Sequence, residues 1–208
     1  MLPYFKNALN DMIHFRPPYV MAIFGPPFLI MAMMLVWKNK QDPVLKIIWK
    51  MALLFFSFIY LMGVSLVTRV ADIPFSVYER VTENRAVFSF AEEEVQLIPF
   101  RSIFHILSYY GMGVNIVGNI LLLLPLGFLL PVWFGKLQGV YRTGFAVMLF
   151  SAGIEFLQII FGVGVGSVDD VILNTLGGLI GYGLFRLAAN VRNQRHLRNK
   201  KGTARGIY

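Results

Sequence analysis

Five apolar stretches, separated by polar or charged segments, set the hydropathy pattern of the chain. A helix needs about 20 mostly apolar residues to cross a bilayer, and each stretch is near that length. The pattern therefore predicts an all-α integral membrane protein with about five transmembrane helices. The stretches are Val20–Trp37, Ile47–Thr68, Val114–Phe134, Thr143–Phe161 and Val171–Ala189.

Three segments depart from this simple pattern. Pro26 and Pro27 interrupt the first stretch, which predicts a kink or a re-entrant turn there. Met1–Arg16 mixes apolar and charged residues and is typical of a short interfacial helix. The second and third stretches are joined by Arg69–Gly113, which is longer than the usual connection. We expect an interfacial helix in this segment after Pro99.

Composition supports the membrane interpretation. The chain is 57% hydrophobic and only 14% charged, whereas an ordinary soluble domain has about 25% charged residues. Cysteine is absent, so the chain has neither disulfides nor thiolate metal sites. The net charge of +8 could suggest nucleic acid binding, but stacking aromatic side chains do not interleave with the basic tail. We therefore predict contact with membrane lipid and not with nucleic acid.

The basic residues predict the orientation. If the tail after Ala189 is cytoplasmic, the segments Trp37–Lys50 and Gly135–Arg142 also lie inside. Together with Arg186, near the inner end of the last span, these regions contain 13 of the 19 Lys and Arg residues. The positive-inside rule then gives an N-outside, C-inside topology, with Arg69–Gly113 as an outer segment. The basic tail would anchor this topology on anionic lipid.

On this basis the chain divides into three regions. Residues 1–113 form an N-terminal membrane region with two spans and the external segment. Residues 114–190 form a core of three helices, and residues 191–208 form a basic cytoplasmic tail.

Polar residues recur in the last three spans, and the topology places them near the outer face. Polar groups are costly in hydrocarbon, so each is a candidate site residue. Helical spacing puts Ser151, Glu155 and Gln158 on one face of their span, and Glu155 lies about 10 Å below its outer end at 1.5 Å per residue. The predicted site, an outer-leaflet polar layer for substrate or ligand binding, comprises Asn115, Asn119, Glu155, Gln158, Asp169, Asp170 and Asn174.

Some of these residues also have structural interpretations. Ser167 and Asp170 fit a capping box at the start of the last span, and capping is the favoured role of Asp169. Gly177 and Gly181, with the neighbouring Gly178 and Gly183, are typical of a close-packing helix face. For Glu155 we favour a functional role, because a carboxylate at that depth needs a partner, a proton or a water-filled cavity.

Four ordered motifs resemble the VanZ-like family, over about Leu97–Tyr182. The family pattern has Asn at position 119, Pro-x-Gly at 125–127, Glu and Gln at 155 and 158, Asp-Asp at 169–170 and Asn at 174, and each is present. The motifs are Leu97–Phe100, Asn119–Phe128, Ile154–Gln158 and Val168–Gly178.

The family is named after a bacterial teicoplanin-resistance protein. The resemblance therefore implies a multi-pass protein of the bacterial cell membrane with a role in glycopeptide resistance. One departure concerns the residues just before the Asp-Asp pair, where the family often has an Arg and a further Asp. This chain has Gly164 and Ser167 near those positions. Arg69, Arg85 or Arg101 could supply the missing positive charge.

Two classes of function stay open. The favoured one is a binding or modulating protein that engages a lipid-linked cell-wall precursor, a lipid or a glycopeptide at the outer leaflet. The alternative is an intramembrane enzyme acting on a lipid or precursor head group, in which Glu155 would be the general base and Asp169 and Asp170 would hold a divalent cation. Nucleotide-binding and HExxH motifs are absent, so we predict no resident cofactor or metal.

Overall fold

The computed structural model describes residues 43–88, 95–96, 99 and 114–205. The expected interfacial helix in Met1–Arg16, the span Val20–Trp37 and the expected helix after Pro99 lie outside these residues. The described part is almost entirely helical. Its elements are α3 (Pro43–Val67), η1 (Val70–Asp72), α4 (Ile73–Thr82), β1 (Val95–Gln96), α6 (Val114–Trp133), η3 (Gly135–Leu137), α7 (Val140–Phe161), β2 (Gly166–Ser167) and α8 (Val168–Arg205).

Four helices in the described ranges are long and apolar enough to cross a membrane. They correspond to the second through fifth predicted spans. The membrane-length segments are Lys50–Val67, Ile116–Trp133, Val140–Phe161 and Val168–Gln194. The all-α prediction is confirmed at this level, and α8 continues as one helix through the basic tail to Arg205.

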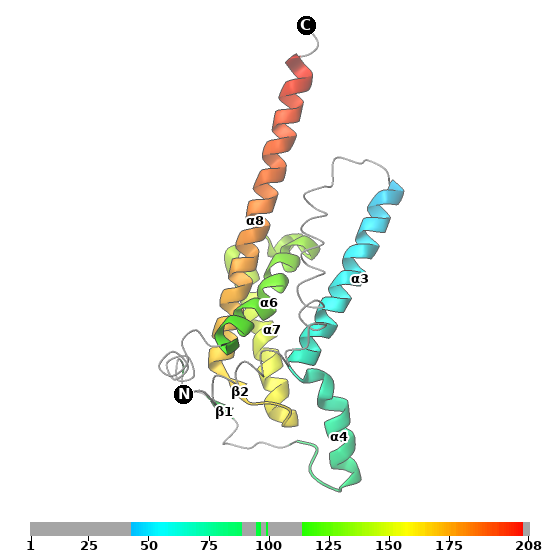
Figure 1. Cartoon of the computed structure of the whole chain (residues 1–208), viewed down its shortest axis with the longest axis vertical. Coiled ribbons are helices and arrows are strands. Elements are labelled where there is room, and N and C mark those ends of the chain that lie inside the picture. The colour runs from blue at the N-terminus through cyan, green and yellow to red at the C-terminus, as the bar shows by residue number, and fades with distance from the viewer. Residues whose placement is uncertain (1–42, 89–94, 97–98, 100–113, 206–208) are drawn as a thin grey trace, which may run out of the picture.

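The long helices alternate in direction, as Figure 1 shows. α6 and α8 run parallel to each other, and α7, which follows α6 and precedes α8 in the sequence, runs antiparallel to both. α3 ends beside the C-terminal end of α7. The start of α6, the end of α7 and the start of α8 therefore lie at one end of the bundle, together with α4, β1 and β2 (Figure 1). The C-terminal part of α8 extends alone beyond the other end (Figure 1).

The core lies mainly along α6. Leu123 and Leu129 of this helix are fully buried and pack with Val147 of α7. Tyr60 of α3 is also fully buried, and its hydroxyl donates a 2.9 Å hydrogen bond to the carbonyl of Leu122. These contacts join α3, α6 and α7 in one hydrophobic core.

The opposite face of α3 remains apolar but exposed. Met51, Leu54, Phe55, Phe58 and Met62 recur at helical spacing, and each is at least 48% exposed. A continuous apolar stripe of this length is unusual on a protein surface surrounded by water. It is the surface expected of a helix that contacts lipid.

Glycines allow α6 and α8 to approach at the level of their backbones. A Cβ atom added at Gly177 would collide with the carbonyl of Ile120, and one at Gly181 would collide with the carbonyl of Leu124. Gly127 likewise faces the backbone of Gly178. The predicted close-packing face at Gly177 and Gly181 is therefore confirmed, and small residues at such positions are the usual basis of close packing between membrane helices.

Gly183 was wrongly included in this packing face. A Cβ atom added there would meet no other atom within 4 Å. It lies two residues after Gly181, and a separation of two residues turns a side chain to a different side of a helix. Proximity in sequence to Gly181 therefore did not place Gly183 on the packing face.

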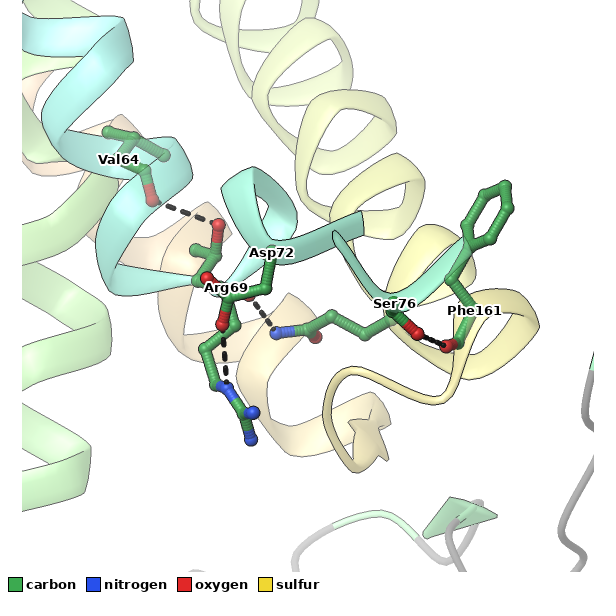
Figure 2. Close-up of polar contacts among 7 residues, drawn as sticks. Val64, Arg69, Asp72, Ser76 and Phe161 are labelled. Carbon is green, nitrogen blue, oxygen red and sulfur yellow. Dashed lines mark hydrogen bonds and ion pairs between the residues drawn. The ribbon is translucent and has the colours of Figure 1, made fainter. Parts of the chain in front are cut away.

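α4 and the end of α3 are held to α7 by polar contacts, several of which Figure 2 shows. The hydroxyl of Ser76 in α4 donates a 3.3 Å hydrogen bond to the carbonyl of Phe161, the last residue of α7 (Figure 2). Nε2 of Gln158 in α7 donates a 2.7 Å hydrogen bond to the carbonyl of Thr68, the residue after α3, and the Thr68 hydroxyl donates to the carbonyl of Val64 at 2.9 Å. The first part of the predicted outer segment is thus an ordered helix attached to the core.

Candidate functional site

Three helices bring polar side chains to the end of the bundle where β1 and β2 lie. Asn119 is in the second turn of α6, and Glu155 is in the last two turns of α7. Asp170 and Asn174 are in the first two turns of α8. We call Asn119, Glu155, Asp170 and Asn174 the polar cluster. They were predicted to share one layer near the outer face, and their place relative to the membrane stays a prediction.

Glu155 is the only carboxylate on α7, and it is buried. Its residue surface is only 8% exposed, and its Oε2 atom accepts a 2.8 Å hydrogen bond from the backbone N–H of Ser167. Ser167 belongs to β2, which pairs in parallel with β1 so that Ser167 faces Gln96. The short strand pair therefore positions a backbone donor against the Glu155 carboxylate.

Asp170 links its own helix, α8, to α6. The side-chain amide of Asn119 donates a hydrogen bond to the Asp170 carboxyl, which joins α6 to α8. The carboxyls of Asp170 and Glu155 are close enough to repel each other electrostatically. In the described ranges, neither carboxyl forms an ion pair with a basic side chain. The cluster thus concentrates negative charge and hydrogen-bond acceptors.

Asn174 adds a further acceptor. The residue is 2% exposed, and its Nδ2 atom donates a 2.8 Å hydrogen bond to the hydroxyl of Ser151, one turn before Glu155 on α7. Its Oδ1 atom is buried and has no hydrogen-bond partner in the part of the chain that the structure describes. A buried acceptor without a partner is uncommon in native structures and calls for an explanation, such as an ordered water or a ligand.

The remaining predicted site residues have different surroundings. Gln158 does not bond to the polar cluster, because its Nε2 atom donates a 2.7 Å hydrogen bond to the carbonyl of Thr68 at the end of α3. Asp169 is buried, with 2% of its surface exposed. Asn115 lies in the first turn of α6, and its side chain is outside the described part. Gln158 therefore joins α7 to α3, and the binding roles of all three stay predictions.

The predicted capping box at Ser167 is wrong. The Ser167 hydroxyl is buried and makes no hydrogen bond in the described ranges, so it does not cap α8. The physical reason is that Ser167 is already part of the extended β2 pair, and its backbone N–H is turned to Glu155. The residue contributes to the site through its backbone and not through its side chain.

Two of the three arginines expected to replace the missing positive charge are engaged elsewhere. Arg69 pairs with Asp72, with Nε at 3.2 Å from Oδ2, as Figure 2 shows. Arg85 pairs with Glu83. Each of these acidic partners lies within three residues of its arginine. Arg101 lies outside the described residues.

Gly164, where the chain departs from the family pattern, lies against the side chain of Gln158. A Cβ atom added at Gly164 would lie 3.1 Å from Nε2 of Gln158. The chain between α7 and β2 therefore passes close over the amide that binds Thr68. A larger residue at position 164 would require the Gln158 side chain to shift.

Sequence reasoning missed the backbone groups of the site. The N–H of Ser167 and the carbonyl of Thr68 carry no residue-type signal, and a two-residue strand has no periodicity from which to predict it. A three-residue metal-ligand group was not found in the described ranges.

Comparison with known proteins places this arrangement in a family. The family described as VanZ/LLP1 matches residues 58–189, which include the whole polar cluster and extend beyond the motifs at Leu97–Tyr182. The chain is also 30% identical over 112 residues to "Protein VanZ" of Enterococcus faecium, over 54% of this chain and 65% of that protein. No solved structure matches the chain. Since the family match covers more than half of its residues, the chain belongs to the VanZ/LLP1 family.

Proposed function

We propose that the polar cluster binds a donor-bearing polar group of a lipid-linked cell-wall precursor or a glycopeptide at the outer leaflet, and that this binding protects the cell against a glycopeptide such as teicoplanin. The observation that carries the proposal is the pair of carboxyls, Glu155 and Asp170, which lie close together without a basic partner in the described ranges. Amide or ammonium donors of a peptide would complement them.

The physical argument concerns desolvation. A carboxylate removed from water loses much of its hydration free energy, and a partner that donates hydrogen bonds or carries positive charge recovers part of it. The existing donors, the Asn119 amide and the Ser167 N–H, satisfy only part of the acceptor capacity of two carboxyls. The free Oδ1 atom of Asn174 adds another acceptor in the same cluster.

Charge distribution supports the outer location. Every acidic residue in the described ranges lies between η1 and the residue after α4, late in α7 or at the start of α8, at the end of the bundle where the polar cluster lies. Lys136, Arg142, Arg186 and Arg192 belong to the opposite end. The positive-inside rule assigns the basic end to the cytoplasm, which leaves the cluster near the outer face.

The first test measures binding and protection together. Native protein, Glu155→Gln and Asp170→Asn are reconstituted in nanodiscs and titrated with teicoplanin or with purified lipid-linked precursor. The same variants are expressed in a teicoplanin-sensitive bacterium, and membrane abundance is measured by immunoblot. Glu79→Gln is the matched control, because it removes an exposed carboxylate from α4 at the same end of the molecule.

We expect native protein and Glu79→Gln to bind one of the two ligands and to raise the inhibitory concentration of teicoplanin. Each cluster variant should bind at least about tenfold more weakly, which corresponds to about 1.4 kcal/mol, and should lose protection at equal abundance. Equal protection by native protein and both cluster variants would remove the cluster from the function. Mass analysis of the precursor after incubation gives a separate readout, because a covalently altered precursor would replace binding with catalysis.

A further inference from the structure

A second candidate site lies at the other end of the bundle. A cavity of about 540 Å³ opens between the C-terminal end of α6 and the last third of the apolar part of α8. This volume is within the range of about 300–1,000 Å³ that is typical of ligand sites. We call it the basic groove. The lining residues that matter for its chemistry are Pro131, Phe185, Arg186, Asn190, Arg192 and Asn193.

The polar side of the groove is positively charged. Arg186 and Arg192 both line it, and neither forms an ion pair within the described ranges. Asn190 and Asn193 also line the groove and add side-chain amide donors. Among the residues that the structure describes, no Asp or Glu lines the groove. The groove therefore complements an anion that accepts several hydrogen bonds.

The other side of the groove is apolar and firmly packed. The ring of Phe185 contacts Phe128 edge-on at a centroid distance of 6.1 Å, and it lies 6.2 Å from the ring of Tyr182. The Pro131 side chain is fully buried, and its carbonyl accepts a 3.2 Å hydrogen bond from Nε2 of Gln138. These contacts fix an apolar wall beside the two arginines, so the groove is amphipathic.

Its position along α8 matches a membrane boundary. Arg192 follows Asp170 by 22 positions on this continuous helix, a distance of about 33 Å at 1.5 Å per residue. The hydrocarbon core of a bilayer is about 30 Å thick. If the polar cluster lies near one face, the basic groove lies near the other, at the level of the phospholipid phosphates.

We propose that the basic groove binds one anionic phospholipid. The phosphate lies between Arg186 and Arg192, the amides of Asn190 and Asn193 bind head-group oxygens, and the first part of an acyl chain lies against Phe185. Amphipathicity selects a lipid over a soluble phosphate, because only a lipid fills both sides of the groove. Basic pockets at the cytoplasmic ends of membrane helices are suited to such head groups. This proposal does not depend on the ligand of the polar cluster.

The test is native mass spectrometry of the full-length protein in detergent, titrated with phosphatidylglycerol or with phosphatidylcholine of the same acyl chains. The test variant is the double substitution Arg186→Gln and Arg192→Gln. The matched control is Lys136→Gln with Arg142→Gln, which removes two positive charges from the same end without altering the groove lining. Thermal melting in detergent verifies that all variants are folded.

We expect native protein and the control to bind one phosphatidylglycerol in preference to phosphatidylcholine. The groove variant should bind it about thirtyfold more weakly, since each basic residue contributes about 1 kcal/mol to binding of an anionic surface and tenfold corresponds to 1.4 kcal/mol. Glycerol phosphate in tenfold excess over the lipid should not displace it. Equal loss in the control variant, equal binding of both lipids, unchanged binding in the groove variant or displacement by glycerol phosphate would each overturn the proposal.

Discussion

The backbone N–H of Ser167 donates a 2.8 Å hydrogen bond to Oε2 of Glu155, across twelve positions of the chain. The donor belongs to the backbone, so no substitution at position 167 other than proline removes it. The acceptor can be either a carboxylate or an amide oxygen. Charge at position 155 can therefore be removed while this bond is kept.

This relationship predicts the stability of Glu155→Gln. Glutamine retains an oxygen that accepts the Ser167 bond, and it removes a carboxyl that repels Asp170. The free energy of unfolding, measured by denaturant titration in mixed micelles, should change by less than about 1.5 kcal/mol. Glu79→Gln again serves as the control. A loss above about 3 kcal/mol would assign the charge itself a structural role.

The bond between Asn119 and Asp170 predicts an energetic coupling between α6 and α8. A double-mutant cycle with Asn119→Ala and Asp170→Ala should give a coupling of about 0.5–2 kcal/mol, the usual range for hydrogen bonds between membrane helices. Thr175 provides the control, because its hydroxyl bonds to Val171 of its own helix. The cycle of Asn119→Ala with Thr175→Ala should give a coupling near zero. Equal coupling in both cycles would argue against a direct bond.

The packing of α8 on α6 predicts opposite effects for two nearby glycines. Gly181→Ala places a methyl group against the carbonyl of Leu124 and should lower the free energy of unfolding by about 1–3 kcal/mol. Gly183→Ala meets open space and should be neutral or stabilise the helix by up to about 1 kcal/mol. Denaturant titration of both variants checks the difference. Similar losses at the two positions would contradict the observed packing.

Single cysteines test the predicted topology. Cysteines are introduced singly at Glu93 and Arg198 into the chain, which has no native cysteine. In intact cells, an impermeant thiol reagent should label position 93 and should label position 198 only after the cells are opened. This result follows from placing the basic segments in the cytoplasm. Labelling of position 198 alone in intact cells would reverse the orientation and move the polar cluster to the inner face.

The sequence predicted the bounds of a helix best where the apolar run and the helix end within one residue of each other. The predicted span Val114–Phe134 corresponds to α6 at Val114–Trp133, because an apolar run and a helix end together there. The last span was predicted to end at Ala189, whereas α8 continues to Arg205. The loss of apolar residues marks the edge of the hydrocarbon and not the end of the helix, since Lys and Arg are themselves good helix formers.

The contacts of the candidate site residues were not predictable from the sequence. Helical spacing placed Glu155 and Gln158 on one face, yet it could not show that Gln158 turns to Thr68 while Glu155 turns to Ser167. That choice depends on which neighbour each residue meets in three dimensions. The β1–β2 pair, which joins positions about 70 residues apart, carried no pattern in the sequence.

The glycine contacts between α6 and α8 also limit motion at the candidate site. Displacement of α8 by one helical turn, about 5.4 Å, would move one of the two glycines into the place of the other and bring Leu173 or Phe185 against the remaining carbonyl, that of Ile120 or Leu124. Sliding of α8 along α6 is therefore sterically opposed, which restricts changes in the separation between Asn119 and Asp170. A ligand at this pair meets a preorganised site, so its affinity is not reduced by the free energy of drawing the two helices together.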